Sequence, residues 1–344
     1  MKEMLIILLV ATGLVFVSGC TIPGLDVDIP FLPDIFPGTQ MKEERHDIVA
    51  IEALRAIPST IVRSGQTIRL QSLIKDLQKP EYEPVNVRVN LYNDCGLFDT
   101  RLELCSGGLK KGDTWCEFKM YPQSTNIVEW VMKAKDVNVE TPCDVGVMVE
   151  YYYKTPTTSS ATFVNKQELE RLVSSGKGVK EIGKAVIGEG PIKTYIEVKP
   201  QPIVVGPDEE GSAVLTFWAE NKGGGLIDSI PYENGNLEFG NVPEMNSLGF
   251  DVKKKVYITI NGDNIKTVSG KSIEECVKEK MKSNGDKYSF YLIGRKTPRY
   301  SCSITAKDAT RIKQEKTYQI TSEIGYWYKF TREIKLTVRP KIRL

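Results

Sequence analysis

Residues 85–91 read Val-Asn-Val-Arg-Val-Asn-Leu, with an apolar side chain at every second position. Because successive side chains of a β-strand point to opposite faces of its sheet, this stretch predicts a strand with one buried and one solvated face. Glycine and proline separate it from other runs rich in Val, Ile, Tyr and Trp. These further runs lie at 66–74, 115–121, 127–133 and 145–153. Short strands separated by turns predict a β-sandwich for this half of the chain.

The β pattern returns in the second half of the chain, and helical patterns interrupt it. A serine and a glutamate three residues apart form a capping box before 273–283, which predicts an inserted helix there. A looser capping pattern begins at Asn165, and glycines follow it, so 166–189 is expected to be a helical linker. The expected strands of the second half lie at 192–198, 212–220, 254–260, 287–293, 300–306, 316–329 and 332–338.

The two β regions repeat each other. An Ala-Lys-Asp sequence precedes an aromatic run in both regions. The first aromatic run is Tyr-Tyr-Tyr at 151–153, and the second is Tyr-Trp-Tyr at 326–328. A further strand is expected directly after each run, at 161–164 and 333–338. Repetition on this scale predicts two related modules.

The strand at 212–220 opens at a glycine and ends in Asn221-Lys222-Gly223. In this it resembles CARDB-type and related immunoglobulin-like domains, which are common in exported archaeal and bacterial proteins. The first module departs from that pattern, because Asp76 takes the place of the asparagine and no glycine follows it. The resemblance implies seven-stranded sandwiches used for spacing, adhesion or presentation, and it brings over no catalytic residue.

These patterns together predict a mainly β fold of two immunoglobulin-like β-sandwich domains joined by a short helical connector. The composition of the chain changes along its length, and these changes set the expected segment boundaries. The segments are a signal peptide at 1–19, a Pro-rich tether at 20–42, the first sandwich at 43–165, the linker at 166–189, and the second sandwich at 190–344 with its inserted helix at 273–283.

The N-terminus carries an export signal. Lys2 precedes the apolar run 4–17, and small residues lead from there to Cys20. The run is shorter than the ~20 residues that span a membrane. The pattern resembles the lipobox of prokaryotic lipoproteins, which implies cleavage before Cys20 and lipidation of Cys20 by at least a diacyl group. The expected location is the outer face of the cell membrane, and the alternatives are an uncleaved anchor or a soluble secreted protein.

Six cysteines remain if Cys20 is lipidated, and an even number in an exported protein predicts disulfides. No two of them have the C-x-x-C spacing of a zinc or redox site, so no metal is expected on them. Cys276 and Cys302 are alone in the second domain, so we expect them to pair.

The four cysteines of the first domain allow three pairings. In an immunoglobulin-like sandwich the strand ends that hold Cys95 and Cys143 can be neighbours. The resemblance therefore favours Cys95–Cys143 together with Cys105–Cys116.

The net charge of +2 is unevenly placed along the sequence. Residues 20–251 hold 23 Lys+Arg against 34 Asp+Glu, whereas residues 252–344 hold 22 against 9. Such asymmetry predicts an anionic polysaccharide or protein partner for the second domain, and not nucleic acid, while a solvated surface without a partner is the alternative. The expected patch comprises Lys253, Lys254, Lys255, Lys278, Lys282, Arg295, Lys296 and Arg299.

The sequence holds few candidates for catalytic residues. His46 is the single histidine, and no hydrolase, metalloprotease, phosphate-loop or dinucleotide motif is present. The glycine run 223–225 and the oxygen-rich run 261–264 have the composition of turns, and neither 261–264 nor Asp26-x-Asp28 fits an EF-hand loop. We therefore expect no catalytic residue, no metal and no cofactor. A carbohydrate-active enzyme with an Asp/Glu pair is a remote alternative.

The two aromatic runs allow two interpretations. Neighbouring strand residues face opposite sides, so Tyr152 and Trp327 should share one face and their flanking tyrosines the other. One set belongs to the core. The other set either packs across strands or is exposed, and exposed aromatic side chains bind sugars and proteins.

The sequence thus predicts a non-catalytic, lipid-anchored binding or presentation module of the cell envelope. In this hypothesis Cys20 anchors the protein, the tether extends, and the second domain reaches outward. The alternative is a structural subunit that self-associates head to tail through its acidic and basic regions.

Overall fold

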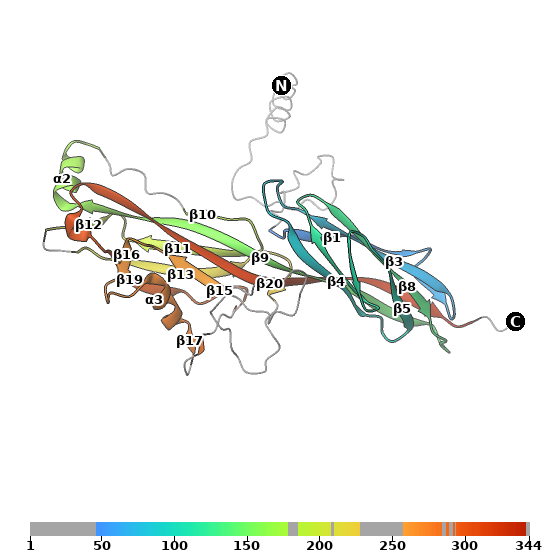
Figure 1. Cartoon of the computed structure of the whole chain (residues 1–344). Helices are drawn as coiled ribbons and strands as arrows, with labels where there is room; N and C mark the ends of the chain where they lie inside the picture. The colour runs from blue at the N-terminus through green and yellow to red at the C-terminus, as the bar shows by residue number, and fades with distance from the viewer. Residues whose placement is uncertain are drawn as a thin grey trace, which may run out of the picture. The chain divides into compact units, whose positions relative to one another are not determined.

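The computed structural model describes residues 46–177, 185–207, 210–227, 257–283, 287–288, 292 and 294–341. Residues 45–344 form one compact unit. The predicted signal peptide, Cys20 and the tether lie outside the described residues. Figure 1 shows that the described chain consists mainly of strands, which confirms the predicted mainly β class. None of the helices within the described ranges is long and apolar enough to cross a membrane.

The first sandwich packs a four-stranded sheet against part of a larger sheet. The four-stranded sheet has the order β1 (Val49–Ile57), β3 (Thr67–Asp76), β8 (Thr125–Ala134) and β5 (Phe98–Cys105). The facing part contains β4 (Val85–Asn93), β7 (Trp115–Met120), β6 (Gly108–Lys111) and the short β2 (Ile61–Arg63). Val85, Val87 and Val89 are buried in the core, which confirms the alternation predicted for 85–91.

The second sandwich repeats this plan. Its four-stranded sheet has the order β11 (Ile192–Lys199), β13 (Ala213–Asn221), β19 (Tyr300–Ala306) and β16 (Ile265–Thr267). The facing strands are β15 (Tyr257–Asn261), β12 (Ile203–Val205), β10 (Val186–Ile187) and β14 (Leu226–Ile227). A small separate ribbon pairs β17 (Lys282–Ser283) with β18 (Lys287–Tyr288). Because both four-stranded sheets have equivalent strand orders, the structure agrees with the internal repeat that the sequence indicates.

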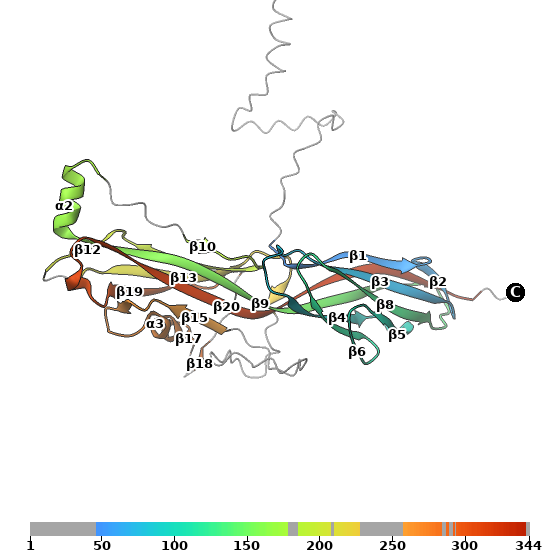
Figure 2. The same cartoon turned by 45° about the horizontal axis from the view of Figure 1, so that its top comes forward.

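Two long strands belong to both sandwiches at once. β9 (Thr141–Asn165) and β20 (Glu315–Arg339) pair antiparallel over their whole length, from Val338 opposite Thr141 to Glu315 opposite Val164. At ~3.3 Å per residue each strand is ~80 Å long. Figures 1 and 2 show them side by side from one sandwich into the other.

This arrangement corrects the predicted domain boundaries. β9 starts in the first sandwich beside β4 and ends in the second beside β12, while β20 takes the opposite course and pairs with β2 near its end. The strand expected at 161–164 therefore completes the second module, and the strand expected at 332–338 completes the first. The modules exchange strands within one chain. What joins them is this pair of strands, rather than the helical connector at 166–189.

The repeated aromatic runs lie at the centre of the exchange. Tyr152 pairs with Trp327, and these residues stand near the midpoint of the paired strands. β9 and β20 therefore pass from one module into the other at their aromatic runs, which occupy equivalent positions in the two repeats. This is the arrangement that an approximate two-fold relation between the modules requires.

Side chains and short strands cover the outer edge of β9. Pro156 is tolerated within it because its carbonyl accepts from the Gly188 N–H (2.8 Å), so the position of the missing N–H faces away from β20. Further along, the Gln201 amide donates to the Ser160 carbonyl (3.0 Å) and accepts from the Thr162 N–H (3.3 Å). A covered edge leaves little for another chain to pair with.

Polar contacts fill the junction between the sandwiches. The Tyr328 hydroxyl donates to Asn221 Oδ1 (3.1 Å) and accepts from the Gly225 N–H (2.7 Å). The Asp47 carboxylate accepts from the Gly224 N–H (2.9 Å), so the chain enters the described unit at this junction. The run 223–225 is a turn, as predicted, and its close approach to Asp47 and Tyr328 leaves no room for a Cβ at Gly223.

Two α-helices lie within the described ranges. Ser272 and Glu275 cap α3 (Ile273–Lys280) with the predicted capping box. The helix is shorter than 273–283, because Met281 is its C-cap and Lys282 already belongs to β17. The other helix, α2 (Lys166–Ser174), follows β9 directly, with the side chain of Asn165 accepting from the Gln167 N–H. A single-turn 3-10 helix spans Ala309–Arg311.

Candidate functional site

The predicted basic patch divides into parts with different surroundings. Lys253, Lys254 and Lys255 lie outside the described residues, as does the side chain of Lys282. Lys278 lies on α3, where its ammonium group pairs with Glu274 one turn earlier. The structure brings the other three members, Arg295, Lys296 and Arg299, to the end of β13.

Glu220 on β13 collects two of the cations at this end of the sheet. Its carboxylate pairs with Lys222 (2.9 Å) and Lys296 (3.3 Å). Partial burial alone would raise the pKa of the Glu220 carboxyl, but the hydrogen bonds from the two lysines outweigh it and hold that pKa below its usual value. Arg295 donates to two main-chain carbonyls, those of Asn221 (3.0 Å) and Gly223. These cations are therefore largely satisfied within the protein.

An aromatic pair lies beside Glu220 on the same outer face. Tyr195 on β11 is the direct cross-strand neighbour of Trp218 on β13, and their rings stack with centroids 5.0 Å apart at 9°. The Arg299 guanidinium lies 4.7 Å from the Trp218 ring, which is cation–π geometry. We call this set the aromatic–cationic surface: Tyr195, Trp218, Glu220, Lys222, Lys296 and Arg299.

Sequence reasoning missed the aromatic members of this surface. Tyr195 and Trp218 are single aromatic residues in alternating strands, and only the pairing register brings them together. One sequence signal was available: each aromatic residue takes the solvent-facing position in the apolar–polar alternation of its strand. Their neighbours Ile196 and Phe217 take the buried positions. Trp, Tyr and Arg are the residues most enriched in binding hot spots, so this arrangement suits contact with a macromolecule.

The predicted aromatic runs have a different role. Tyr151, Tyr326 and Tyr328 are fully buried, and Tyr153 is nearly so. Burial raises the pKa of Tyr153 to about 12 and raises those of the other three well above the usual range. Tyr152 and Trp327 share the opposite face, as expected, with centroids 5.8 Å apart, and Trp327 is 8% exposed. The tyrosines are junction residues and not a sugar platform.

A second charged feature lies on the outer face of β4, β7 and β9. Arg88 pairs with Glu117 (2.8 Å) and Glu150 (3.8 Å), and both glutamates are almost fully buried. The Arg88 guanidinium also lies 5.0 Å from the Trp115 ring. These are direct cross-strand neighbours, so the cluster stabilises the sheet register.

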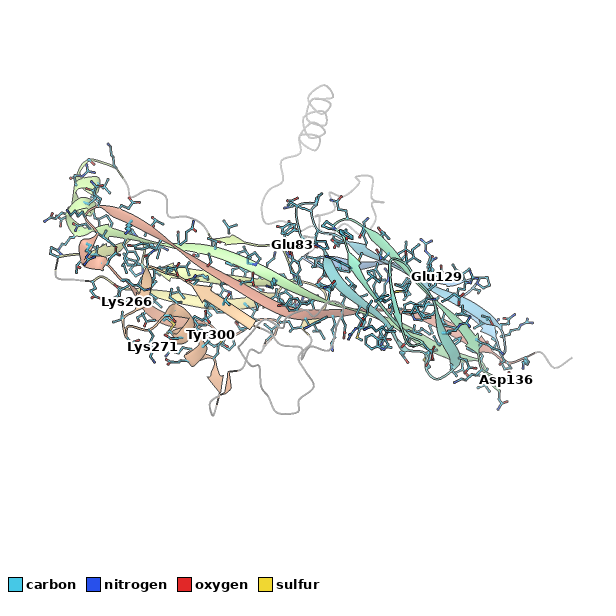
Figure 3. All side chains as sticks on the ribbon, viewed as in Figure 1. Glu83, Glu129, Asp136, Lys266, Lys271 and Tyr300 are labelled. Carbon is cyan, nitrogen blue, oxygen red and sulfur yellow. A yellow bond between two sulfur atoms is a disulfide. The ribbon has the colours of Figure 1, made fainter. Side chains whose placement is uncertain are left out.

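The charge asymmetry of the sequence does not separate the two sandwiches, because the division at residue 251 lies inside the sequence of the second one. Residues 46–154 with 329–344, which include the shared strand's basic end, hold 19 Lys+Arg against 16 Asp+Glu. Residues 155–328 hold 24 against 22. The two net charges are +3 and +2, so the sequence-level difference between −11 and +13 does not separate the two sandwiches. Figure 3 shows charged side chains along both of them.

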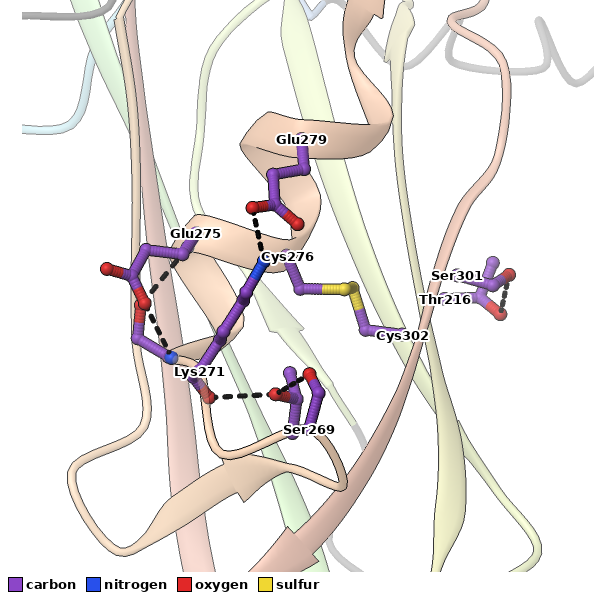
Figure 4. The surroundings of a disulfide bond; sticks show 10 residues. Thr216, Ser269, Lys271, Glu275, Cys276, Glu279, Ser301 and Cys302 are labelled. Atoms are coloured by element: carbon purple, nitrogen blue, oxygen red, sulfur yellow. Dashed lines mark hydrogen bonds and ion pairs between the residues drawn. A yellow bond between two sulfur atoms is a disulfide. The ribbon is translucent and has the colours of Figure 1, made fainter.

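All three predicted disulfides are present. Cys95–Cys143 and Cys105–Cys116 lie in the first sandwich. Cys276–Cys302 ties α3 to β19, next to the Lys271–Glu279 ion pair (2.6 Å), as Figure 4 shows. Three disulfides are typical of an exported protein.

The remaining residues considered for metal binding or catalysis are not gathered into a site within the described ranges. No group of three or more His, Cys, Asp or Glu side chains in the described ranges could hold a metal ion. The run 261–264 is a turn closed by the Ile265 N–H to the Gly262 carbonyl (2.8 Å). His46 is half-buried just before β1. Asp26 and Asp28 lie outside the described residues.

No family model matches the chain, and no curated protein matches it. The solved structures similar to it include the Enterococcus faecalis MSCRAMM ACE, described as binding its ligands by the collagen hug model, at 8% identity over 84% of this chain and 95% of that one, with a TM-score of 0.16. Another is the C-terminal domain of the Streptococcus agalactiae AgI/II polypeptide BspA, at 12% identity over 82% and 96%, with a TM-score of 0.15. With TM-scores this low, the fold rests on this chain's own sheets.

Proposed function

We propose that this protein is a non-catalytic binding and presentation module of the cell envelope, exported and held at the outer face of the membrane by a lipid on Cys20. The observation that carries the proposal is the pair of strands β9 and β20, which build both sandwiches without a hinge in either strand. A body of this kind holds two binding faces at a fixed separation.

The junction supports the same function. Tyr326 bonds to the Thr155 hydroxyl (2.9 Å) and accepts from the Ile192 N–H (3.3 Å), while Lys79 pairs with Glu189 (2.6 Å) across the two modules. Bending at this point would expose buried hydroxyls and break those contacts. The sandwiches are therefore expected to move as one body.

The position of Asp47 bears on how the two sandwiches are presented to partners. Asp47, near the start of the described residues, accepts from the Gly224 N–H at the junction between the two sandwiches. We therefore propose that presentation is not limited to the second domain. Both sandwiches are available to partners, and the aromatic–cationic surface is the face that we assign to a macromolecular contact on the second.

Fractionation and surface accessibility test the anchored, outward-facing location. In cells that express the protein, it should sediment with membranes, yield to protease added outside intact cells, and appear in the soluble fraction after Cys20→Ser. Mass spectrometry should find an acylated Cys20 as the first residue. Full protection from external protease, or an intact Met1 on the mature chain, would exclude this location.

Binding to isolated envelopes tests the module itself. Residues 21–344 should bind saturably to envelopes stripped of the native protein, and Trp218→Ala with Arg299→Ala should weaken that binding at least tenfold, as removal of hot-spot residues does. The matched control is Val214→Ala, an exposed residue of the same strand that lies outside the surface. Unsaturable binding, or equal loss in the control, would contradict a specific module.

A further inference from the structure

Three cations form a diagonal across the outer face of the sheet β1-β3-β8-β5. Arg55 lies on β1, Arg69 on β3 and Lys133 on β8, and all three are exposed. Arg69 is directly opposite Ile57 on one side and Val131 on the other. Arg55 and Lys133 are therefore its two diagonal neighbours, each ~7–8 Å away between Cα atoms.

These three cations have no anionic partner within the described ranges. None of them makes an ion pair or a side-chain hydrogen bond there. The carboxylates of this face are already engaged: Glu52 with Lys75 (3.1 Å), Asp99 with Lys135 (3.6 Å), Glu103 with Arg101 (3.0 Å) and Glu129 with the Gln71 amide (2.6 Å). Figure 3 marks Glu129 on this sandwich. The Gln71 amide is neutral, so Glu129 keeps its negative charge, and the three cations of the diagonal leave the face net positive.

The floor between the cations is aliphatic. Ile57 is 45% exposed, and Val131 is half-buried between Arg69 and Arg101. The outward residues of β3 and β8 include no aromatic side chain. A flat, cation-lined face of this kind lacks the bulky apolar wedge that binding to a lipid surface uses.

We propose that this face binds a linear anionic polysaccharide, with Arg55, Arg69 and Lys133 contacting successive acidic groups of one extended chain. A polymer with carboxylate or sulfate groups at regular intervals matches cations that repeat at ~7–8 Å. The two guanidinium groups can each take an acidic group in bidentate fashion, and sugar rings can rest on the aliphatic floor. The proposal rests on the proposed binding function and names the partner class for the first sandwich.

The placement differs from the sequence prediction, which put the anionic partner on residues 252–344. In the described part of that region, Lys296, Arg299 and Lys278 already face Glu220, Trp218 and Glu274. The three cations of the diagonal instead belong to the first sandwich, where the pairing register places them side by side. Exposed cations of the second sandwich outside the aromatic–cationic surface supply a control with equal charge.

Retention on polygalacturonate, a linear polymer with one carboxylate per sugar, tests the proposal. Residues 21–344 should bind it in low salt and elute as salt rises, because ionic contacts are screened. One exposed ionic contact is worth about two- to fivefold in affinity, so Arg55→Gln, Arg69→Gln and Lys133→Gln together should lower affinity at least tenfold. The control variant removes three exposed cations of the second sandwich that lie outside the aromatic–cationic surface: Lys307→Gln, Arg311→Gln and Lys313→Gln.

The control variant and a parallel binding assay with lipid vesicles separate the possible results. A control loss under threefold, with unchanged melting temperatures for both variants, supports the diagonal. The double variant Arg55→Lys, Arg69→Lys should keep most of the binding, since it keeps the charges. Equal losses in both triple variants, no binding of the parent protein, or capture by phosphatidylglycerol vesicles in place of the polymer would each overturn the proposal. If the diagonal variant still binds isolated envelopes normally, the proposed binding function is retained, but an anionic polysaccharide is excluded as the partner of this face.

Discussion

Leu336→Ala is the most direct probe of the exchanged strands. Leu336 lies near the end of the sequence, yet it is fully buried opposite Cys143 in the first sandwich. Truncating a buried leucine to alanine removes transfer energy and leaves a cavity, at a cost of about 3–5 kcal/mol. Because β20 also builds the second sandwich, the loss should destabilise both sandwiches together.

Tryptophan fluorescence separates the two sandwiches in urea. Trp130 reports on the first and Trp218 on the second, after Trp115 and Trp327 are replaced by phenylalanine. With an unfolding slope of about 3 kcal/mol/M, the midpoint of both probes should fall by roughly 1 M. Coincident transitions would show that the 45–344 unit unfolds as one.

The reciprocal change tests the same coupling from the other side. Ile304 is fully buried on β19, so Ile304→Ala should move the Trp130 transition as well as that of Trp218. Leu226→Ala, at a site 65% exposed, should shift neither by more than about 0.5 kcal/mol. If Leu336→Ala moves Trp130 and leaves Trp218 in place, the sandwiches are independent and the reasoning fails.

Three further predictions concern cleavage, pH and redox state. A protease site placed at 178–184 should give two fragments that co-elute under native conditions and part only in denaturant, because β9 and β20 hold them together; two separately folded fragments would contradict the exchange. Burial raises the pKa of the Asp76 carboxyl from 3.8 to about 6, so the free energy of unfolding should fall by about 2 kcal/mol as pH rises from 4 to 7, and Asp76→Asn should flatten that slope in urea titrations at each pH. Replacing Cys276 and Cys302 by serine should lower the free energy of unfolding by about 3–4 kcal/mol, since the bond closes a span of 26 residues; an unchanged denaturation midpoint would show that the bond adds no stability.

Local pattern predicted most of the elements but not their partners. The alternation at 85–91, the capping box at Ser272 and the Cys276–Cys302 pair follow from neighbouring residues or from the cysteine count, and the structure confirms them. The two pairings of the first domain were favoured by the immunoglobulin-like resemblance, and the structure confirms them as well. β5 was missed because a bulge between Leu102 and Leu104 interrupts its register, which breaks strict alternation.

The exchange itself could not be predicted from the sequence. A strand that ends at residue 153 and resumes at 161 has the same pattern as one that continues, because threonines and serines between them suit either a turn or an edge strand. The decision depends on tertiary contacts such as those of Gln201 with Ser160 and Thr162. Charge counted along the chain likewise assigns β20's basic end to the second sandwich, whereas strand pairing places it in the first.

The course of β20 has a consequence for the timing of folding during export. The first sandwich takes its strand from residues close to the C-terminus, so about 170 residues must emerge after β9 before that sheet can close. Contacts this distant in sequence form slowly, because loop closure precedes any gain from pairing. The first sandwich is therefore expected to reach its final form only after β20 has emerged. Until then, the first module exposes an unpaired strand edge, and a chaperone that shields such edges would be its natural companion.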